Sequence, residues 1–420
     1  MNLVPDNAGQ TLAHRSWQWR DNIWTLGLYG TAVGAGTLFL PIEIGTRGPV
    51  IFLVMLLLGL PLSLMPHLLL CRVYMKEAPS GDSALPVFGS FFRGKGELAM
   101  LLFYCLTFFP VTLVYGTSLV NALDNYLTTR LHFHLIHRSV ISFIVVACLY
   151  AVLSKGRDKV VSTLSALALP FAISIVLIAV SQIPHWHLDN FTGAIENVRT
   201  TPPGATFKGV WLTLPLIAFS FCCAPMISPL ASWYREKQES GERKALRVIR
   251  VAYAAIFISI IFFVLSCVLS IPQATFIHAK AQNLNVLSIM TGGEGGGMVY
   301  YVAPFIAILG MTKSFLGVGL SVADTLARLL SSAGGEKRRV GKGVAWLLMF
   351  AVTFGVVDAN PDVITLIETI CGPMIAVILF LIPAWLIYTR EELRSLRGAK
   401  AIMVIIGGLA TLSALFYSMI

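Results

Sequence analysis

Long runs of apolar residues, separated by short polar segments, dominate the whole sequence. A helix that crosses the hydrocarbon core of a bilayer needs about 20 mostly apolar residues. A transmembrane β-barrel would instead need segments of about ten residues with alternating polarity, and none of these runs alternates. The pattern therefore predicts an all-α membrane protein with eleven transmembrane helices: Asn22–Ile44, Val50–Leu70, Leu98–Val120, Ser139–Leu153, Val160–Ile183, Gly209–Tyr234, Val251–Ile271, Met298–Leu330, Gly343–Val357, Val363–Tyr388 and Ala401–Met419.

The composition agrees with this prediction and excludes several other classes of protein. Apolar residues make up 56% of the 420 residues, charged residues make up only 12%, and the mean hydropathy is +0.77. A soluble protein needs about 25% charged residues to cover its surface. A soluble enzyme, a disordered protein and a nucleic-acid binder are therefore excluded, although the formal net charge is +10. The expected surroundings are a lipid bilayer, with no nucleic-acid partner.

The basic residues predict the orientation of the eleven spans. With the N-terminus inside, 24 of the 31 Lys and Arg residues fall in cytoplasmic segments, 6 fall in outer segments, and Lys313 lies within a span. Cytoplasmic loops of membrane proteins carry such an excess of Lys and Arg. We therefore expect a cytoplasmic N-terminus and a periplasmic C-terminus. Residues 1–21 are polar and lack the apolar core of a cleavable signal peptide, so the first span is the expected targeting signal.

The sequence contains no motif for soluble catalysis or for a cofactor. There is no GxxxxGK[ST] loop for ATP, no HExxH, and no CxxC pair at metal-ligand spacing. The seven cysteines lie in or at the edge of spans, which does not suggest an extracellular disulfide framework. We therefore expect neither an enzyme nor a bound cofactor or metal.

Spans 1 and 6 correspond to each other if the first ten spans form two halves of five. Each is interrupted by small or helix-breaking residues and ends near a proline, Pro41 or Pro229. Because five is odd, the second half would lie upside down relative to the first. Paired interrupted spans in corresponding positions are typical of the binding site of an inverted-repeat transporter. Gly and Pro are also common in membrane helices generally, so the pairing alone leaves this open.

Span 1 contains three glycines within the seven residues from Gly30 to Gly36. Each costs a helix about 1 kcal/mol relative to alanine, so the helix can open and free backbone amides at the middle of the bilayer. Freed amides at the positive end of a half-helix bind a carboxylate. The residues expected to do so are Thr31, Ala32, Val33, Gly34, Ala35 and Gly36. The alternative is that the small residues only allow close helix packing.

Span 6 contains Pro225, which lacks a backbone donor and clashes with the carbonyl of Phe221 four residues earlier. We therefore expect the helix to break between Phe221 and Ala224. Unwound carbonyls there can hold an ammonium group. The candidate ligands for the ammonium and the side chain of a substrate are Ser220, Phe221, Cys222, Cys223 and Ala224. An ordinary proline kink is the alternative.

Four motifs occur in order along nearly the whole chain: Gly30-Thr-Ala-Val-Gly-Ala-Gly-Thr-Leu-Phe-Leu-Pro41, Ser220-Phe-x-x-x-Pro-Met-Ile-Ser228, Thr312-Lys-Ser-Phe-Leu-Gly317, and Glu368-Thr-Ile-Cys-Gly-Pro373 followed by Leu379-Phe-Leu-Ile-Pro383. Together they resemble the bacterial hydroxy and aromatic amino acid permease family. The resemblance implies a LeuT-like five-plus-five inverted repeat, one extra helix, and proton-coupled uptake. The first motif is more similar to the serine/threonine branch, but Cys222-Cys223 replaces the polar residues typical of that branch, which leaves the exact substrate open.

Charged residues inside spans are rare and usually functional. In a LeuT-like arrangement, Lys313 would lie where a sodium ion can sit and could couple transport to protons. A permanent pairing with a carboxylate or with carbonyls of span 1 is the alternative. We expect Asp324, on the same face toward the cytoplasm, and Glu368, in the outer part of span 10, to act in gating, and Glu43 to be interfacial.

The sequence therefore predicts a secondary transporter of the bacterial inner membrane that imports a small neutral amino acid, serine or threonine, with protons. It would consist of a cytoplasmic segment (residues 1–21), a ten-helix core (22–388), and an eleventh helix with a periplasmic end (389–420). No obligate protein partner is evident. An aromatic amino acid symporter is the main alternative, and an ion channel is a further one.

Overall fold

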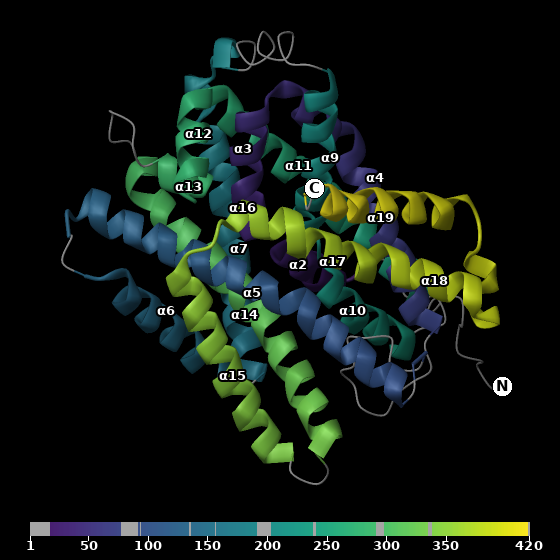
Figure 1. Ribbon diagram of the computed structural model, residues 1–420. Helices are drawn as coiled ribbons and strands as arrows, with labels where there is room; N and C mark the ends of the chain where they lie inside the picture. Colours follow the sequence, from purple (N-terminus) through teal and green to yellow (C-terminus); the bar gives the residue numbers. More distant parts are fainter. Residues whose placement is uncertain are drawn as a thin grey trace, which may run out of the picture.

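The computed structural model describes residues 17–76, 91–92, 94–133, 136–155, 157–190, 203–237, 241–290, 298–334 and 338–418, and this part of the chain is almost entirely helical, without strands (Figure 1). The N-terminal segment before Trp17 and Met419 in the last predicted span lie outside the described residues. An all-α fold is therefore confirmed for the part that is described.

Every apolar run predicted from the sequence is helical. Seven runs correspond to single helices, which are α4 (Pro49–Lys76), α5 (Lys95–Arg130), α6 (Arg138–Leu153), α7 (Arg157–Ser181), α11 (Gly241–Ser270), α14 (Met298–Gly334) and α15 (Arg338–Ala359). The last run corresponds to α19 (Ala399–Ser418). The first and the sixth run are each divided in two, as α2 (Trp19–Ala32) with α3 (Ala35–Arg47), and α9 (Pro203–Ser220) with α10 (Ala224–Lys237).

The tenth run is a continuous helical segment with two wider turns. It consists of α16 (Val363–Leu366), the π-helical η2 (Ile367–Cys371), α17 (Gly372–Ala376), the π-helical η3 (Val377–Leu381) and α18 (Ile382–Thr389). Short helices join the long ones: η1 (Ile183–His185), α12 (Gln273–Ala281), α13 (Val286–Ile289) and η4 (Glu391–Leu396). The side chain of Asn285 caps α13 and that of Asp362 caps α16.

By length and composition, six of the described helices can each cross a membrane, and two bent pairs raise this number to eight. Three shorter apolar helices lie at Arg138–Leu153, Gly343–Ala359 and Ala399–Ala414. Large apolar side chains such as Leu57, Ile258 and Leu347 are about 70% exposed. Side chains of this kind on the outer face suit a hydrocarbon environment, so the helices form a multi-pass membrane protein.

The two divided helices pack among the long ones. In Figure 1, α6 and α15 lie on one side of the bundle, α4, α18 and α19 lie on the other, and α5 runs across the view between them. The long helix α14 packs against α5, α7 and α15, whereas α4 packs against α9, α10 and α11. Between them, α2 contacts α7 and α11, and α3 contacts α9, α12 and α14. The breaks in α2–α3 and α9–α10 are therefore surrounded by other helices.

Candidate functional site

The first helix break lies where the glycines of span 1 predict it. α2 ends at Ala32, α3 begins at Ala35, and the two axes differ by 48°. Val33 is extended (φ −77°, ψ 90°) and Gly34 has φ −143° and ψ −148°, so neither residue continues the helix.

The break leaves the positive end of α3 without a side-chain cap. Gly34 is the N-cap residue and has no side chain that could accept a hydrogen bond. The first amides of a helix have no acceptor within the helix, and they carry the partial positive charge of the helix dipole. The amides of Ala35 and Gly36 are in this position. A carboxylate is the ligand that such an end favours.

Lys313 of α14 binds the other side of the break, at the C-terminal end of α2. Its ammonium group, 3% exposed, donates hydrogen bonds to the carbonyl of Gly30 and, at 2.8 Å, to that of Val33. It also lies 4.8 Å from the centroid of the Phe171 ring on α7. Among the described residues, no carboxylate forms an ion pair with Lys313. A cation at the negative end of α2 is electrostatically favourable.

The second break lies between Ser220 and Ala224, as Pro225 predicts, and its two helices differ in direction by 42°. Side chains of α4 and α11 bind the unwound backbone. The Tyr253 hydroxyl donates to the carbonyl of Phe221 at 2.8 Å, and the amide of Cys223 donates to Nε2 of His67 at 3.1 Å. Two of the backbone groups freed by this break are thus already paired within the protein.

The hydrogen bonds of His67 define its tautomer. Nε2 accepts from an amide, so the proton must lie on Nδ1, which is 2.7 Å from the carbonyl oxygen of Ser63. The ring is therefore neutral and fully buried. Cys223 is also fully buried, with its Sγ 3.1 Å from the Tyr253 hydroxyl, whereas Cys222 is partly exposed. Of the two cysteines, Cys222 is the one that remains accessible.

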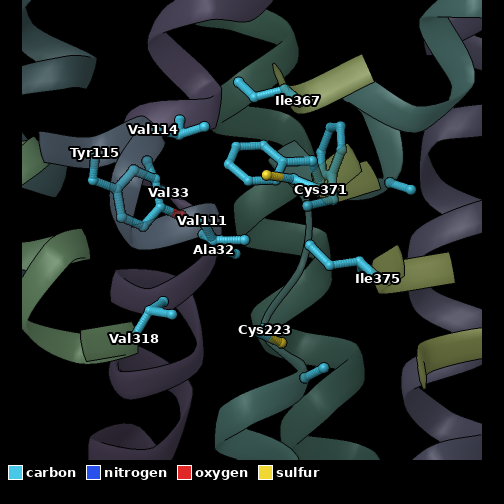
Figure 2. Packing of buried hydrophobic residues seen from close by; sticks show 14 of the residues in the cluster. Ala32, Val33, Val111, Val114, Tyr115, Cys223, Val318, Ile367, Cys371 and Ile375 are labelled. Atoms are coloured by element: carbon cyan, nitrogen blue, oxygen red, sulfur yellow. The ribbon is translucent and has the colours of Figure 1, made fainter. Parts of the chain in front are cut away.

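The two breaks lie next to each other. A Cβ atom added to Gly36 would come within 2.9 Å of Cα of Ser220 and of the Phe219 ring, so a larger residue would separate α3 from α9. Around the breaks, Figure 2 shows Val111, Val114 and Tyr115 of α5 on one side and Cys371 and Ile375 on the other. The predicted site residues of spans 1 and 6 are thus brought together by the fold.

Three buried hydroxyl groups near the start of α3 have no hydrogen-bond partner among the described residues. They belong to Thr37, Ser220 and Ser314. Ser220 ends α9 and Ser314 directly follows Lys313 on α14. An unpaired buried hydroxyl is unfavourable by about 1–3 kcal/mol. These hydroxyl groups therefore lack a partner in this conformation, and a polar ligand that reached them would complete their hydrogen bonding.

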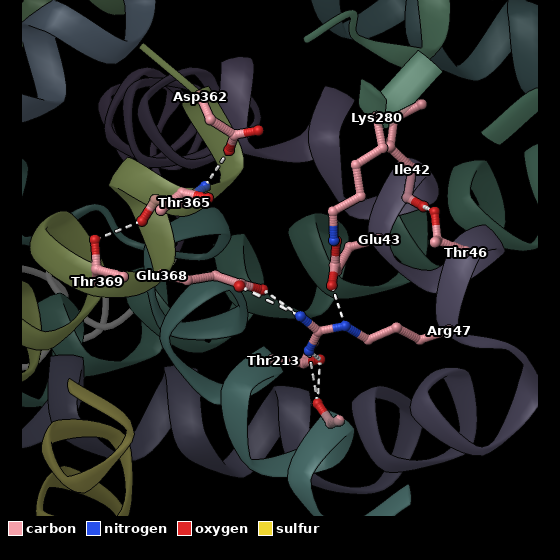
Figure 3. Close-up of polar contacts among 11 residues, drawn as sticks. Ile42, Glu43, Thr46, Arg47, Thr213, Lys280, Asp362, Thr365, Glu368 and Thr369 are labelled. Carbon is pink, nitrogen blue, oxygen red and sulfur yellow. Dashed lines mark hydrogen bonds and ion pairs between the residues drawn. The ribbon is translucent and has the colours of Figure 1, made fainter. Parts of the chain in front are cut away.

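A cluster of charged residues surrounds the Arg47 end of α3 (Figure 3). The Arg47 guanidinium forms an ion pair with Glu43, donates to Glu368 at 3.1 and 3.3 Å, and donates to Thr213 at 2.8 Å. Lys280 of α12 lies 2.6 Å from the other oxygen of Glu43. The cluster joins α3, α9, α12 and η2. Glu43 is covered by α12 and its side chain is 0% exposed, so it faces the protein interior, while its expected depth near the membrane interface stays a prediction.

Asp324 lies apart from these groups. Its side chain is exposed and forms no ion pair within the described part of the chain, whereas Lys313 on the same helix is buried. The described residues also contain no group of three His, Cys, Asp or Glu side chains that could hold a metal ion.

A second polar cluster, which the sequence did not indicate, lies at the Trp19 end of α2. Asp21 is 1% exposed and accepts hydrogen bonds from the Tyr234 hydroxyl at 2.5 Å and from the amide of Gln18 at 2.7 Å. Nζ of Lys244 lies 3.3 Å from its carboxylate. The cluster joins α2 to α10 and α11. In the sequence, the only indication of this cluster is an acidic residue, Asp21, next to the start of the first predicted span.

Comparison with known proteins decides the family. Residues 18–270 match the family model described as transmembrane amino acid transporter protein. The chain belongs to this transporter family. It is 32% identical to the serine transporter SdaC of Escherichia coli K12 over 416 residues, which cover 96% of each chain. It is 30% identical to the threonine/serine transporter TdcC of Escherichia fergusonii over 432 residues, again 96% of each chain.

A third relative is the inner membrane transport protein YqeG of Escherichia coli K12, which is 31% identical over 411 residues, 96% of this chain and 99% of that protein. The resemblance to the hydroxy and aromatic amino acid permease family, on its serine/threonine side, is thereby confirmed. The chain is a transporter rather than an enzyme, and a multi-pass protein of the inner membrane.

Proposed function

We propose that this transporter imports serine or threonine together with protons by alternating access. The observation that carries the proposal is the uncapped N-terminus of α3 at a helix break that is surrounded by other helices. A free amino acid has a carboxylate that suits this end. The names of the relatives, serine transporter and threonine/serine transporter, support the choice of substrate.

We further propose that the chain has eleven spans arranged as a LeuT-like five-plus-five inverted repeat with one extra helix. The six long helices, the two bent pairs and the three shorter apolar helices correspond one by one to the eleven predicted runs. The breaks occur in the first helix of each proposed half. In this arrangement residues 1–21 are cytoplasmic, residues 22–388 form the core, and the helix within residues 389–420 ends in the periplasm.

In this proposal the substrate carboxylate binds at Thr31 to Gly36, mainly through the amides at the start of α3. The ammonium and side chain lie against Ser220 to Ala224. Since Phe221 and Cys223 are already paired with Tyr253 and His67, Cys222 is the residue of this segment that is most available to the substrate side chain.

Lys313 is the proposed coupling residue. As an ammonium it holds the carbonyls of Gly30 and Val33, and after losing a proton it can donate fewer hydrogen bonds to them and no longer attracts the negative end of α2. Proton release would thus loosen α2 from α14. Glu368, through its ion pair with Arg47, is the proposed gating residue on the outer side, and Asp324 is the proposed gating residue toward the cytoplasm.

The coupling role is tested by Lys313→Met in proteoliposomes with an imposed proton gradient. We expect serine accumulation against its own gradient to be lost, while serine binding persists. Lys400→Met, which changes an exposed lysine, is the control and should accumulate serine normally. Undiminished proton-driven accumulation by Lys313→Met would refute the coupling role.

The carboxylate site is tested separately by Gly34→Leu. The added side chain would overlap the Ser314 hydroxyl at the start of α3, so we expect serine binding to be lost. Normal affinity in this variant would show that the carboxylate binds elsewhere. Competition for uptake between serine, threonine, cysteine and tryptophan distinguishes the proposed substrates from an aromatic one. Electrical conductance without saturable uptake would indicate a channel.

A further inference from the structure

The hydroxyl of Ser314 is placed where a bound ligand would complete its hydrogen bonding. The residue is 8% exposed, and its Oγ has no partner among the described residues. Serines inside membrane helices usually satisfy themselves by donating to the carbonyl four residues earlier. Ser63, Ser118 and Ser270 of this chain do so. Ser314 does not, although it lies in the middle of the long helix α14.

The same hydroxyl lies against the N-cap position of α3. A Cβ atom added to Gly34 would overlap Ser314 Oγ, so the hydroxyl occupies the space beside this glycine. A serine or threonine at an N-cap would use its own oxygen to accept a hydrogen bond from the first helix turn. Gly34 cannot do this, and Ser314 makes no such bond to α3 either. A polar group between the first amides of α3 and the Ser314 hydroxyl would satisfy both.

We propose that Ser314 donates a hydrogen bond to the carboxylate of the substrate, alongside the first amides of α3. This inference rests on the proposed function and adds a substrate-binding residue that the sequence did not indicate. Lys313 and Ser314 are consecutive on α14, and each lies next to a different side of the break. Lys313 binds the carbonyls at the end of α2, and Ser314 lies at the start of α3. One turn of α14 thus serves both sides of the break.

The position of Ser314 selects the carboxylate over the other polar groups of the substrate. The start of α3 is a positive helix end, which attracts an anion and repels an ammonium group. Ser220, the other unpaired serine, ends α9, and a helix C-terminus is negative and favours the ammonium. The neutral side-chain hydroxyl of a substrate gains less electrostatic stabilisation at either of these helix ends. Ser314 should therefore contribute to the binding of every amino acid that the site accepts.

The test compares Ser314→Ala with Ser142→Ala in the full-length transporter. Ser142 lies on α6, is fully buried, and likewise has no partner for its hydroxyl within the described residues, which makes it a matched control. Binding of labelled L-serine is measured in competition with unlabelled L-serine and L-alanine. These two ligands share the carboxylate and differ by the side-chain hydroxyl. Thermal unfolding of each variant verifies that it is folded.

We expect Ser314→Ala to weaken binding of both ligands by the same factor, roughly tenfold to a hundredfold for a hydrogen bond to a charged group. Ser142→Ala should bind both normally. Unchanged affinity in Ser314→Ala would overturn the inference, and so would a loss confined to L-serine, which would assign the hydroxyl to the substrate side chain. A loss seen only with sodium present would make Ser314 a cation ligand and would also overturn it.

The failure of this inference differs from the failure of the proposed function. If Ser314→Ala binds normally while Gly34→Leu does not bind, the carboxylate still lies at α3 without help from Ser314. If the unaltered protein binds neither serine nor threonine, the proposed function itself is refuted, and the inference is refuted with it.

Discussion

Arg47→Met removes the cation that joins Glu43, Glu368 and Thr213 at the far end of α3. This cluster links α3 to α9, α12 and η2 on the proposed outer side of the substrate. If the cluster keeps that side closed, the variant should populate an outward-open state more often. Glu43 would keep Lys280 as a partner at 2.6 Å, but Glu368 would lose its only described ion pair.

The size of the effect follows from the burial of the groups. Removing one partner of a fully buried ion pair is unfavourable by about 3–5 kcal/mol. Arg47 is 18% exposed and Glu368 is 13% exposed, so some water reaches the pair and the value must be reduced. We therefore expect the closed state to lose about 2–3 kcal/mol, which corresponds to a shift of roughly 30-fold to 150-fold in the equilibrium between closed and open.

Cys222 provides a native reporter for this equilibrium, because it lies in the second break and is partly exposed. The other six cysteines are replaced, and a membrane-impermeant thiol reagent is added to the outer side of oriented vesicles. We expect Arg47→Met to accelerate modification of Cys222 from that side and to slow it from the opposite side.

Arg394→Met is the control, because Arg394 is 75% exposed and its ion pair with Glu391 should contribute little. It should leave both rates unchanged. An unaltered or slower rate of Cys222 modification from the outer side in folded Arg47→Met would refute the gating role of the cluster.

Two further substitutions test the polar groups that the sequence did not indicate. His67→Phe leaves the buried amide of Cys223 without an acceptor and should reduce stability by about 1–3 kcal/mol; a lower melting temperature in detergent checks this, and the exposed His187→Phe should melt normally. Asp21→Asn leaves Lys244, 8% exposed, without its ion pair and should reduce stability by about 3 kcal/mol; an unchanged melting temperature would show that the pair contributes nothing.

The helices and the two breaks could be predicted because their causes are local. A run of about 20 apolar residues predicts a helix without knowledge of its neighbours. The glycines between Gly30 and Gly36, and Pro225 with the carbonyl of Phe221, weaken a helix within one or two turns. These features are contained in short windows of sequence, and the structure has them at the expected residues.

Of the groups that hold the breaks, the contact of Lys313 with carbonyls of span 1 is among the alternatives that the sequence leaves open, although Lys313 lies 283 residues from Gly30. The groups at the second break could not be predicted, because they come from distant parts of the chain: His67 lies 156 residues from Cys223. The burial of Glu43 depends on α12, a helix too short and too polar to appear as a span. The position of a residue along a span indicates its depth in the membrane. It does not indicate which other element packs against that residue.

The two breaks are held by groups of different charge. His67 and Tyr253, which bind the second break, are a neutral ring and a phenol, whereas the first break depends on the ammonium of Lys313. In the proposed coupling, loss of a proton from Lys313 would therefore change the attachment of α2 and leave the contacts of α9 and α10 intact. On the α2 side, the substrate site would then respond to the proton gradient. On the side of α9 and α10, it would keep the same contacts in both protonation states of Lys313.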